Sequence, residues 1–189
     1  MSASEARPIE FPVEGLSDGS VRVRLRADSD TPSVIEACQD PEVVRWTRVP
    51  DHYDEHAAEE WMAESNRQRE RGEGLHLVIA DASSDAFLGS VGIHRIDPVE
   101  GRCDIGYFLA PWARGRGAMT GAVRLLSGWI FEALPIERIE ITIEPANGPS
   151  RAVAERAGYR LEGILRSHTV IKGTRRDMAM YSLLRGELQ

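Results

Sequence analysis

Apolar and polar residues alternate along several short segments of this chain, and this alternation predicts β-strands. The first, residues 21–26, has valine or leucine at every second position and arginine between them. Residues 75–80, 87–96 and 102–109 follow one another across turn residues, which indicates an antiparallel meander. The later segments with strand character are residues 138–143, 159–168 and 177–184.

Apolar residues three and four positions apart predict helices between these strands. The longest helix is expected from residue 119 to residue 133, with one apolar face buried against a sheet. Because this helix joins two predicted strands, the strand before it and the strand after it must run parallel. Shorter helices are expected at residues 31–38, 54–69 and 148–157.

Together these elements predict an α/β (α+β) fold, a mixed and mostly antiparallel sheet of six to seven strands flanked by helices. The length of 189 residues, with 42% hydrophobic and 28% charged residues, fits one globular domain. Residues 1–18 contain Pro8, Pro12 and Gly15 but no periodic apolar spacing, which indicates an extended N-terminal arm. The single domain is therefore expected to span residues 19–189.

Charge and cysteine usage narrow the function classes. With 23 Lys and Arg against 30 Asp and Glu, the net charge of −7 disfavours the basic surface that nucleic-acid binding needs. The sequence has no run of apolar residues typical of a membrane span or a secretory signal. Cys38 and Cys103 lack partners at disulfide or metal-ligand spacing. We therefore expect a cytoplasmic protein that binds no metal, no nucleic acid and no membrane.

The segment at residues 114–119 carries the most specific chemistry. It reads Arg-Gly-Arg-Gly-Ala-Met and lies between a predicted strand and the long helix. Glycines let a phosphate approach the backbone, and free N–H groups at a helix start carry partial positive charge. A Rossmann fingerprint fits poorly, because Thr120 holds its third glycine position, and the Gly-Lys-Ser/Thr of a P-loop is absent. The segment therefore fits a diphosphate, with an ordinary glycine-rich connection as the plain alternative.

Four motifs in the chain are similar to those of the GCN5-related N-acetyltransferase (GNAT) family. They are Asp-Ile-Gly-Tyr-Phe-Leu at residues 104–109, the loop at 114–119, Asn-Gly-Pro-Ser at 147–150 and Ala-Gly-Tyr at 157–159. Four motifs in order are far more specific than one glycine loop. Within the family, the chain most resembles the ribosomal-protein alanine N-acetyltransferase group, and the resemblance covers about residues 21–184.

The resemblance implies a GNAT fold whose sheet splays after its fourth strand, with acetyl-CoA bound in the split. Backbone amides of that strand would hold the pantetheine, and the glycine loop would hold the pyrophosphate. Met119 departs from the family pattern of this loop, and Asn147 could hold the pantetheine arm or simply be a helix N-cap. The residues expected to bind the cofactor are Phe108, Leu109, Arg114, Gly115, Arg116, Gly117, Ala118, Met119, Asn147 and Ser150.

The resemblance also suggests two catalytic residues, Ser150 and Asp104. Many family members have a tyrosine acid where this chain has Ala154, which moves the acid role to Ser150. Asp104 stands where the family often has an acid, although a strand carboxylate can equally be a structural partner. The general base stays open between Asp104, His168 and a water relay, because Thr169 stands where the ribosomal group has a glutamate base.

Other histidines are interpreted as structural. His94 ends a core strand, where a histidine is more often a satisfied polar residue than a base. His52 and His56 are four residues apart, but Asp54 as an N-cap would leave His52 outside the helix, so no metal site is expected.

The expected function is acetyl-CoA-dependent N-acetylation by direct attack of an amine, with a protein or peptide N-terminus favoured as acceptor. Acetylation of a small amine, such as an aminoglycoside or a polyamine, is an alternative that the acidic segment 55–64 would suit. A domain that senses acyl-CoA without turnover is a second alternative, because the family tyrosine is absent. Monomer and homodimer are both compatible with the sequence.

Overall fold

The computed structural model describes residues 7–188. Its centre is an eight-stranded sheet with the strand order β1-β2-β3-β4-β5-β6-β8-β7. Neighbouring strands are antiparallel except β5 and β6, which are parallel. The strands are β1 (Leu16–Ser17), β2 (Val21–Arg24), β3 (Leu75–Asp81), β4 (Phe87–Asp97), β5 (Arg102–Leu109), β6 (Arg138–Ile143), β7 (Arg160–Ile171) and β8 (Thr174–Leu184). The helices are η1 (Asp28–Asp30), α1 (Thr31–Cys38), α2 (Pro41–Trp46), α3 (Glu55–Glu70), η2 (Pro111–Ala113), α4 (Ala118–Ala133) and α5 (Gly148–Arg156).

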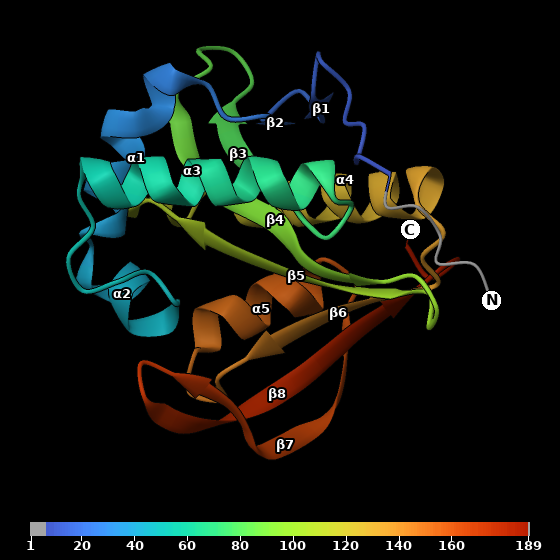
Figure 1. The fold of residues 1–189 in the computed structure, drawn as a ribbon. Coiled ribbons are helices and arrows are strands. Elements are labelled where there is room, and N and C mark those ends of the chain that lie inside the picture. Colours follow the sequence, from blue (N-terminus) through green and yellow to red (C-terminus); the bar gives the residue numbers. More distant parts are fainter. Residues whose placement is uncertain (1–6, 189) are drawn as a thin grey trace.

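Helices cover both faces of the sheet (Figure 1). α4 crosses β1 to β5 on one face, α1 and α3 pack on the other, and α5 lies beside α4 against β6 and β7. Alternation along β3 explains why both faces are buried: Leu75 and Leu77 join the core under α4, while Val78 and Ala80 join the core under α1 and α3. The predicted mixed, mostly antiparallel sheet flanked by helices is confirmed.

The sequence pattern does not predict α2, β1 or the two 3-residue helices η1 and η2. A helix of 6 residues and a strand of 2 residues are too short to show a period. The start of α2 does carry a local signal, because Asp40 accepts hydrogen bonds from the amides of Glu42 and Val43 and Pro41 occupies the first turn. β1 brings the sheet to eight strands instead of the six to seven expected.

Part of the segment expected as an extended arm packs against the rest of the chain. Ile9 and Phe11 are buried in the main core, where the Phe11 ring lies edge-on to Trp129 of α4 with 4.9 Å between ring centroids. The Ile9 amide donates a hydrogen bond to the carbonyl of Arg69 near the end of α3. Residues 1–6 of this segment lie outside the described residues.

The sheet splays between β5 and β6 after a short stretch of parallel pairing. The paired positions are Arg102 with Arg138, Cys103 with Ile139, and Asp104 with Glu140. Beyond them, β5 continues to Leu109 and β6 continues to Ile143, but the two strands no longer pair with each other. Their arrowheads diverge in Figure 1. The backbone groups of β5 that face this gap are open to a ligand that adds to the sheet like a strand.

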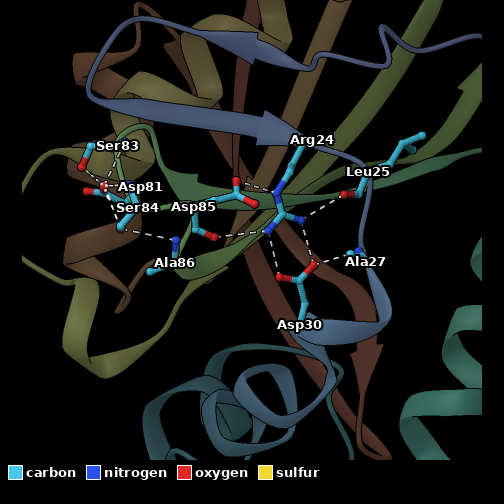
Figure 2. A network of polar contacts seen from close by, with 9 residues as sticks. All are labelled: Arg24, Leu25, Ala27, Asp30, Asp81, Ser83, Ser84, Asp85 and Ala86. Atoms are coloured by element: carbon cyan, nitrogen blue, oxygen red, sulfur yellow. Dashed lines mark hydrogen bonds and ion pairs between the residues drawn. The ribbon is translucent and has the colours of Figure 1, made fainter.

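An ion-pair network ties the first helices to the sheet (Figure 2). The Arg24 guanidinium donates to both carboxylate oxygens of Asp30, at 2.8 and 2.9 Å, and to Asp85 in the turn before β4 at 2.9 Å. The side chains of Arg24 and Asp30 are only 14% and 5% exposed. Burial by itself raises the pKa of Asp30, but the bonds from Arg24 and from the Ala27 amide outweigh it and hold this pKa below its usual range.

Candidate active site

One cavity of about 720 Å³ runs from the splay to the space between the helices and the β7–β8 hairpin. Its first part, here called the splay half, is lined by Phe108, Leu109, Asn147 and Ser150 among others. Its second part, the helical half, is lined by α2, α3, β3, β4 and the hairpin tip, including Trp46, Trp61, His76, His94 and Thr169. Of the residues expected to bind the cofactor, the cavity wall includes Phe108, Leu109, Arg114, Met119, Asn147 and Ser150, and Gly115, Arg116, Gly117 and Ala118 lie outside it.

The glycine loop leaves its backbone uncovered at the start of α4. Gly115 and Gly117 both have a φ of +79°, the left-handed region that glycine adopts readily, and a Cβ at either position would meet nothing within 4 Å. Gly117 is the N-cap of α4 and provides no side-chain cap for the first amides of the helix. The side chain of Met119, the residue that departs from the family pattern of this loop, is 3% exposed and packs in the core. The loop therefore offers free amides to an anion.

The two arginines of the loop have different surroundings. Arg114 lines the cavity and donates a hydrogen bond to Asp40, the N-cap of α2. Burial by itself raises the pKa of Asp40, but Arg114 and the Val43 amide bring this pKa below its usual range. Arg116 is exposed. Arg114 thus connects α2 to the loop, while Arg116 reaches into solvent.

Asn147 and Ser150 lie together at the start of α5. The side-chain oxygen of Asn147 accepts a hydrogen bond from the Ser150 amide at 3.2 Å, so Asn147 is the N-cap of this helix. Pro149 occupies the first turn, where a missing N–H is tolerated. The cap uses the oxygen of Asn147 and leaves its amide nitrogen available to a ligand, so the structural role and a binding role are compatible.

Tyr107 is a site residue that is not among those expected from the sequence. The Ser150 hydroxyl donates to the Tyr107 hydroxyl at 3.2 Å, and the Tyr107 hydroxyl lies at 3.2 Å from the Ser150 carbonyl. Burial raises the pKa of Tyr107 to about 12, although the bond from Ser150 acts in the opposite direction. Both residues line the cavity, so the splay half contains a pair of protonated hydroxyls. Tyr107 belongs to the family motif at residues 104–109, and this is the sequence signal that could have indicated it.

Asp104 occupies the last paired position before β5 and β6 separate. Its carboxylate accepts a hydrogen bond from Arg95 at 3.0 Å, and its side chain is 32% exposed. Asp104 lines the cavity, but it is also the structural partner of Arg95. The two interpretations of this residue are therefore both compatible with its surroundings.

The structure does not bring His168 to the site. A register shift in β7 between Leu165 and Thr169 provides the bulge that His168 would need, but the His168 side chain is exposed and not part of the cavity wall. Thr169 does line the cavity, and its hydroxyl accepts a hydrogen bond from Arg48 at 2.8 Å. A histidine that the cavity does contain is His94, on β4.

Within residues 7–188, the structure places no group of three or more His, Cys, Asp or Glu side chains where it could hold a metal ion. His56 instead lies 3.4 Å from Glu60 on the exposed side of α3. No helix in this part of the chain is long and apolar enough to cross a bilayer.

The sheet is splayed beside a glycine loop, and polar groups lie along the split. This geometry suits the class of protein that binds an extended ligand containing a diphosphate. Comparison with known proteins agrees with this class. Residues 21–160 match the family described as the acetyltransferase (GNAT) domain. An uncharacterized N-acetyltransferase of Bacillus licheniformis, p20, is 30% identical over 175 residues, which are 93% of this chain and 98% of p20.

The names of two further similar proteins refer to the acetylation of ribosomal proteins. The ribosomal-protein-serine acetyltransferase of Escherichia coli is 28% identical over 98 residues, 52% of this chain and 55% of that protein. The structure of RimL, a ribosomal L7/L12 α-N-protein acetyltransferase in complex with coenzyme A, superposes with a TM-score of 0.81 at 20% identity, covering 92% of this chain and 98% of RimL. At that identity the superposition establishes the fold alone.

The chain belongs to the GNAT acetyltransferase family. It is an N-acetyltransferase, a class of enzyme whose acetyl donor is acetyl-CoA. The expectation of a GNAT enzyme similar to the ribosomal-protein acetyltransferases is confirmed at the level of family and fold.

Replacing Gly117 with alanine is expected to weaken acetyl-CoA binding more than it lowers stability. A Cβ at this left-handed position costs about 1 kcal/mol in the folded state, and it also projects into the open space beside the free amides. Gly19→Ala is the matched control, because Gly19 has a φ of +86°, nothing lies within 4 Å of its Cβ position, and it is not part of the cavity wall. Calorimetric titration should show weaker binding only for Gly117→Ala; equal affinities of the two variants would contradict a phosphate site at this loop.

Proposed function

We propose that this enzyme transfers the acetyl group of acetyl-CoA to the N-terminal amine of a protein or peptide. The observation that carries this proposal is the single cavity that joins the splay half to the helical half, because donor and acceptor can then meet beside Ser150 and Tyr107. The name of the E. coli enzyme supports a protein acceptor, and the name of RimL supports the α-amine of a protein.

In this proposal the splay half binds the donor. The pantetheine lies along the unpaired edge of β5 at Phe108 and Leu109, and the amide nitrogen of Asn147 contacts it from α5. The pyrophosphate lies on the amides of residues 115–119, at the positive end of the α4 dipole. Arg114 and Arg116 contribute the positive charge of this loop, with Arg114 shared between the ligand and Asp40.

The chemical step is a direct transfer without a covalent enzyme intermediate. The amine nitrogen forms a bond to the acetyl carbon, the carbon–sulfur bond breaks, and CoA leaves as a thiolate that needs a proton. Ser150 gives this proton. Its hydroxyl is the donor to Tyr107 in the structure, so it turns to the thiolate and then accepts a proton from the Tyr107 hydroxyl, which is protonated at neutral pH. Holding both substrates in one cavity supplies the remaining rate enhancement through orientation.

The shape of the helical half favours a slim chain end over a side chain on a folded surface. The tip of the β7–β8 hairpin is bridged to the segment before α3: Arg48 donates to Thr169 at 2.8 Å and to the Val170 carbonyl at 3.0 Å. Lys172 donates to Asp51 at 2.7 Å and to the Val44 carbonyl at 2.8 Å. These bridges form a strap across one side of the helical half, which favours an acceptor that enters end-on.

A panel of three acceptors tests the proposal by the release of CoA thiol from acetyl-CoA. The first is a peptide with a free N-terminus, the second is the same peptide with a blocked N-terminus and an internal lysine, and the third is a polyamine. We expect turnover with the first and little with the others. Turnover with the polyamine alone would assign a small-amine acceptor, and no turnover with any amine would contradict the function.

A further inference from the structure

The general base of the reaction is still to be assigned among the residues of the cavity. Asp104 is paired with Arg95, His168 is exposed outside the cavity wall, and Thr169 has no basic group. An ammonium group cannot attack, so a group beside it must first accept one of its protons. The helical half must therefore contribute that group, or water must carry the proton away.

A β-bulge places His94 at the start of the splay. Ile93 pairs with Ile105 and Arg95 pairs with Asp104, so His94 is the extra residue opposite the β5 ladder. The bulge lets both His94 and Arg95 lie on the side of the sheet that Asp104 faces, as the Arg95–Asp104 ion pair requires. Bulges of this kind often redirect a side chain beside an active site.

The imidazole of His94 lies directly over Gly106 of β5. A Cβ at Gly106 would come within 2.5 Å of the Nε2 atom of His94, so only glycine leaves room for the ring. Gly106 is the second residue after the last β5–β6 pair at Asp104, which puts the imidazole where the sheet begins to open. His94 lines the cavity and is solvent accessible there.

His94 and the hydroxyl pair lie at the same level of β5 on opposite faces of the sheet. Gly106 and Tyr107 are neighbours in the strand, and neighbouring strand residues face opposite sides. The Tyr107 hydroxyl contacts Ser150 on the α5 side, whereas His94 covers Gly106 on the α3 side. An acetyl group in the splay would therefore have a proton acceptor on one side and proton donors on the other, which suits attack by the amine and departure of the thiolate.

We propose that His94 is the general base of this acetyltransferase, an assignment that rests on the proposed function. The imidazole of His94 takes a proton from the bound ammonium group, the freed amine nitrogen bonds to the acetyl carbon, and the second proton of this nitrogen passes to solvent. The carbon–sulfur bond breaks and the thiolate takes a proton from the Ser150–Tyr107 pair. The proton held by His94 then returns to solvent, which also reprotonates the hydroxyl pair, so the enzyme is restored without any other reactant.

The groups around His94 favour its neutral form. Enclosure by protein lowers its pKa most, Asp104 on β5 acts to raise it, and Arg48 before α3 acts to lower it, with a net shift below the usual value. His76 on β3 lies 5.1 Å away between ring centroids, and burial lowers its pKa to about 4. The net effect favours the neutral imidazole, which is the form that accepts a proton, and the base is lost as the pH falls through its lowered pKa.

His76 is arranged to support His94 without competing as the base. Gln68 donates to Glu64 at 3.1 Å, which fixes its amide orientation and turns its oxygen toward Nε2 of His76 at 3.1 Å. Nε2 of His76 therefore carries the proton. The ring of His76 stacks edge-on between Trp61 and His94, with centroid distances of 4.9 and 5.1 Å. It acts as a positioning residue that holds the His94 ring over Gly106.

The test compares His94→Asn and His94→Gln with the control His168→Asn, whose side chain lies outside the cavity wall. With a peptide N-terminal amine, kcat should fall about 10²–10⁴-fold in both His94 variants and remain unchanged in the control. The thermal shift produced by acetyl-CoA should be the same in all four proteins, which excludes misfolding and loss of the donor site. Similar kcat values in the two His94 variants would show that the defect comes from the loss of the imidazole and not from the particular replacement.

A second acceptor distinguishes a base from a structural residue. The hydrazide analogue of the same peptide end has a nitrogen that is neutral across the pH range of the assay, so it needs less help from a base. We expect the defect of His94→Asn to shrink strongly with the hydrazide, and the wild-type kcat to decrease as the pH falls, with a profile that His94→Asn lacks. Equal defects with both acceptors, or a wild-type rate in His94→Asn, would overturn the assignment while the proposed function stands. A wild-type enzyme that acetylates no amine would contradict both.

Discussion

The double variant Ser150→Ala/Tyr107→Phe is expected to lose about 10²–10⁴-fold in kcat without weaker acetyl-CoA binding. The two hydroxyls are hydrogen-bonded to each other at 3.2 Å, and together they are the proton source for the departing thiolate in this account. Because they act as a unit, each single variant should lose a large part of the effect, and the losses should not add. Steady-state kinetics at saturating acetyl-CoA gives these values.

The chain offers a matched control for this prediction. Ser127 and Tyr159 form a second hydroxyl pair, at 2.7 Å, that is buried in the core and outside the cavity wall. Ser127→Ala/Tyr159→Phe makes the same chemical change there, and removal of both partners of a buried hydrogen bond costs little. We expect near-normal kcat for this control. Equal kcat values for the two double variants would show that the hydroxyls at the cavity are not the acid.

The second large effect is on stability. Arg24→Met is expected to lower the free energy of unfolding by about 3–5 kcal/mol, because it leaves the buried carboxylate of Asp30 without its cation. For a chain of 189 residues this corresponds to a fall in the unfolding midpoint of roughly 10 °C. Arg67→Gln is the control, since the Arg67–Glu64 pair is 51% and 47% exposed and such pairs contribute about 0–1 kcal/mol.

Urea unfolding of the two variants measures both values. The pH dependence gives an independent check: the pKa of Asp30 is below its usual value of about 4, so the stability it contributes is present above that value and lost as the pH falls through the lower folded pKa. Arg24→Met should lose this dependence. Similar losses in Arg24→Met and Arg67→Gln would mean that the network in Figure 2 contributes no more than a surface pair.

Much of this fold can be predicted from the sequence because its signals are local. Alternation marks β2 to β8, and the left-handed φ of Gly117 and the N-caps Asp54 and Asn147 depend on residues next to them. Elements shorter than a period cannot be found this way. β1 is therefore missed, and so is α2, although Asp40 and Pro41 mark its start.

The site is less predictable because its partners are distant in sequence. Tyr107 and Ser150 are 43 residues apart and meet only because β6 runs parallel to β5 before α5 begins. His94 depends on a register shift that the alternation of β4 does not reveal, and it is interpreted from the sequence as a structural histidine. The bulge in β7 exists, yet it leaves His168 outside the cavity. Register and long-range pairing decide these placements.

The central claim is that the splay between β5 and β6 binds acetyl-CoA, and thermal unfolding with added ligands tests it most directly. A ligand at about 100 times its Kd stabilises the native state by about 2.7 kcal/mol, which should raise the unfolding midpoint of this chain by roughly 5–10 °C. The account predicts this shift with acetyl-CoA and with CoA and no shift with NAD or ATP. An unchanged midpoint with acetyl-CoA and CoA, or equal shifts with all four ligands, would contradict it.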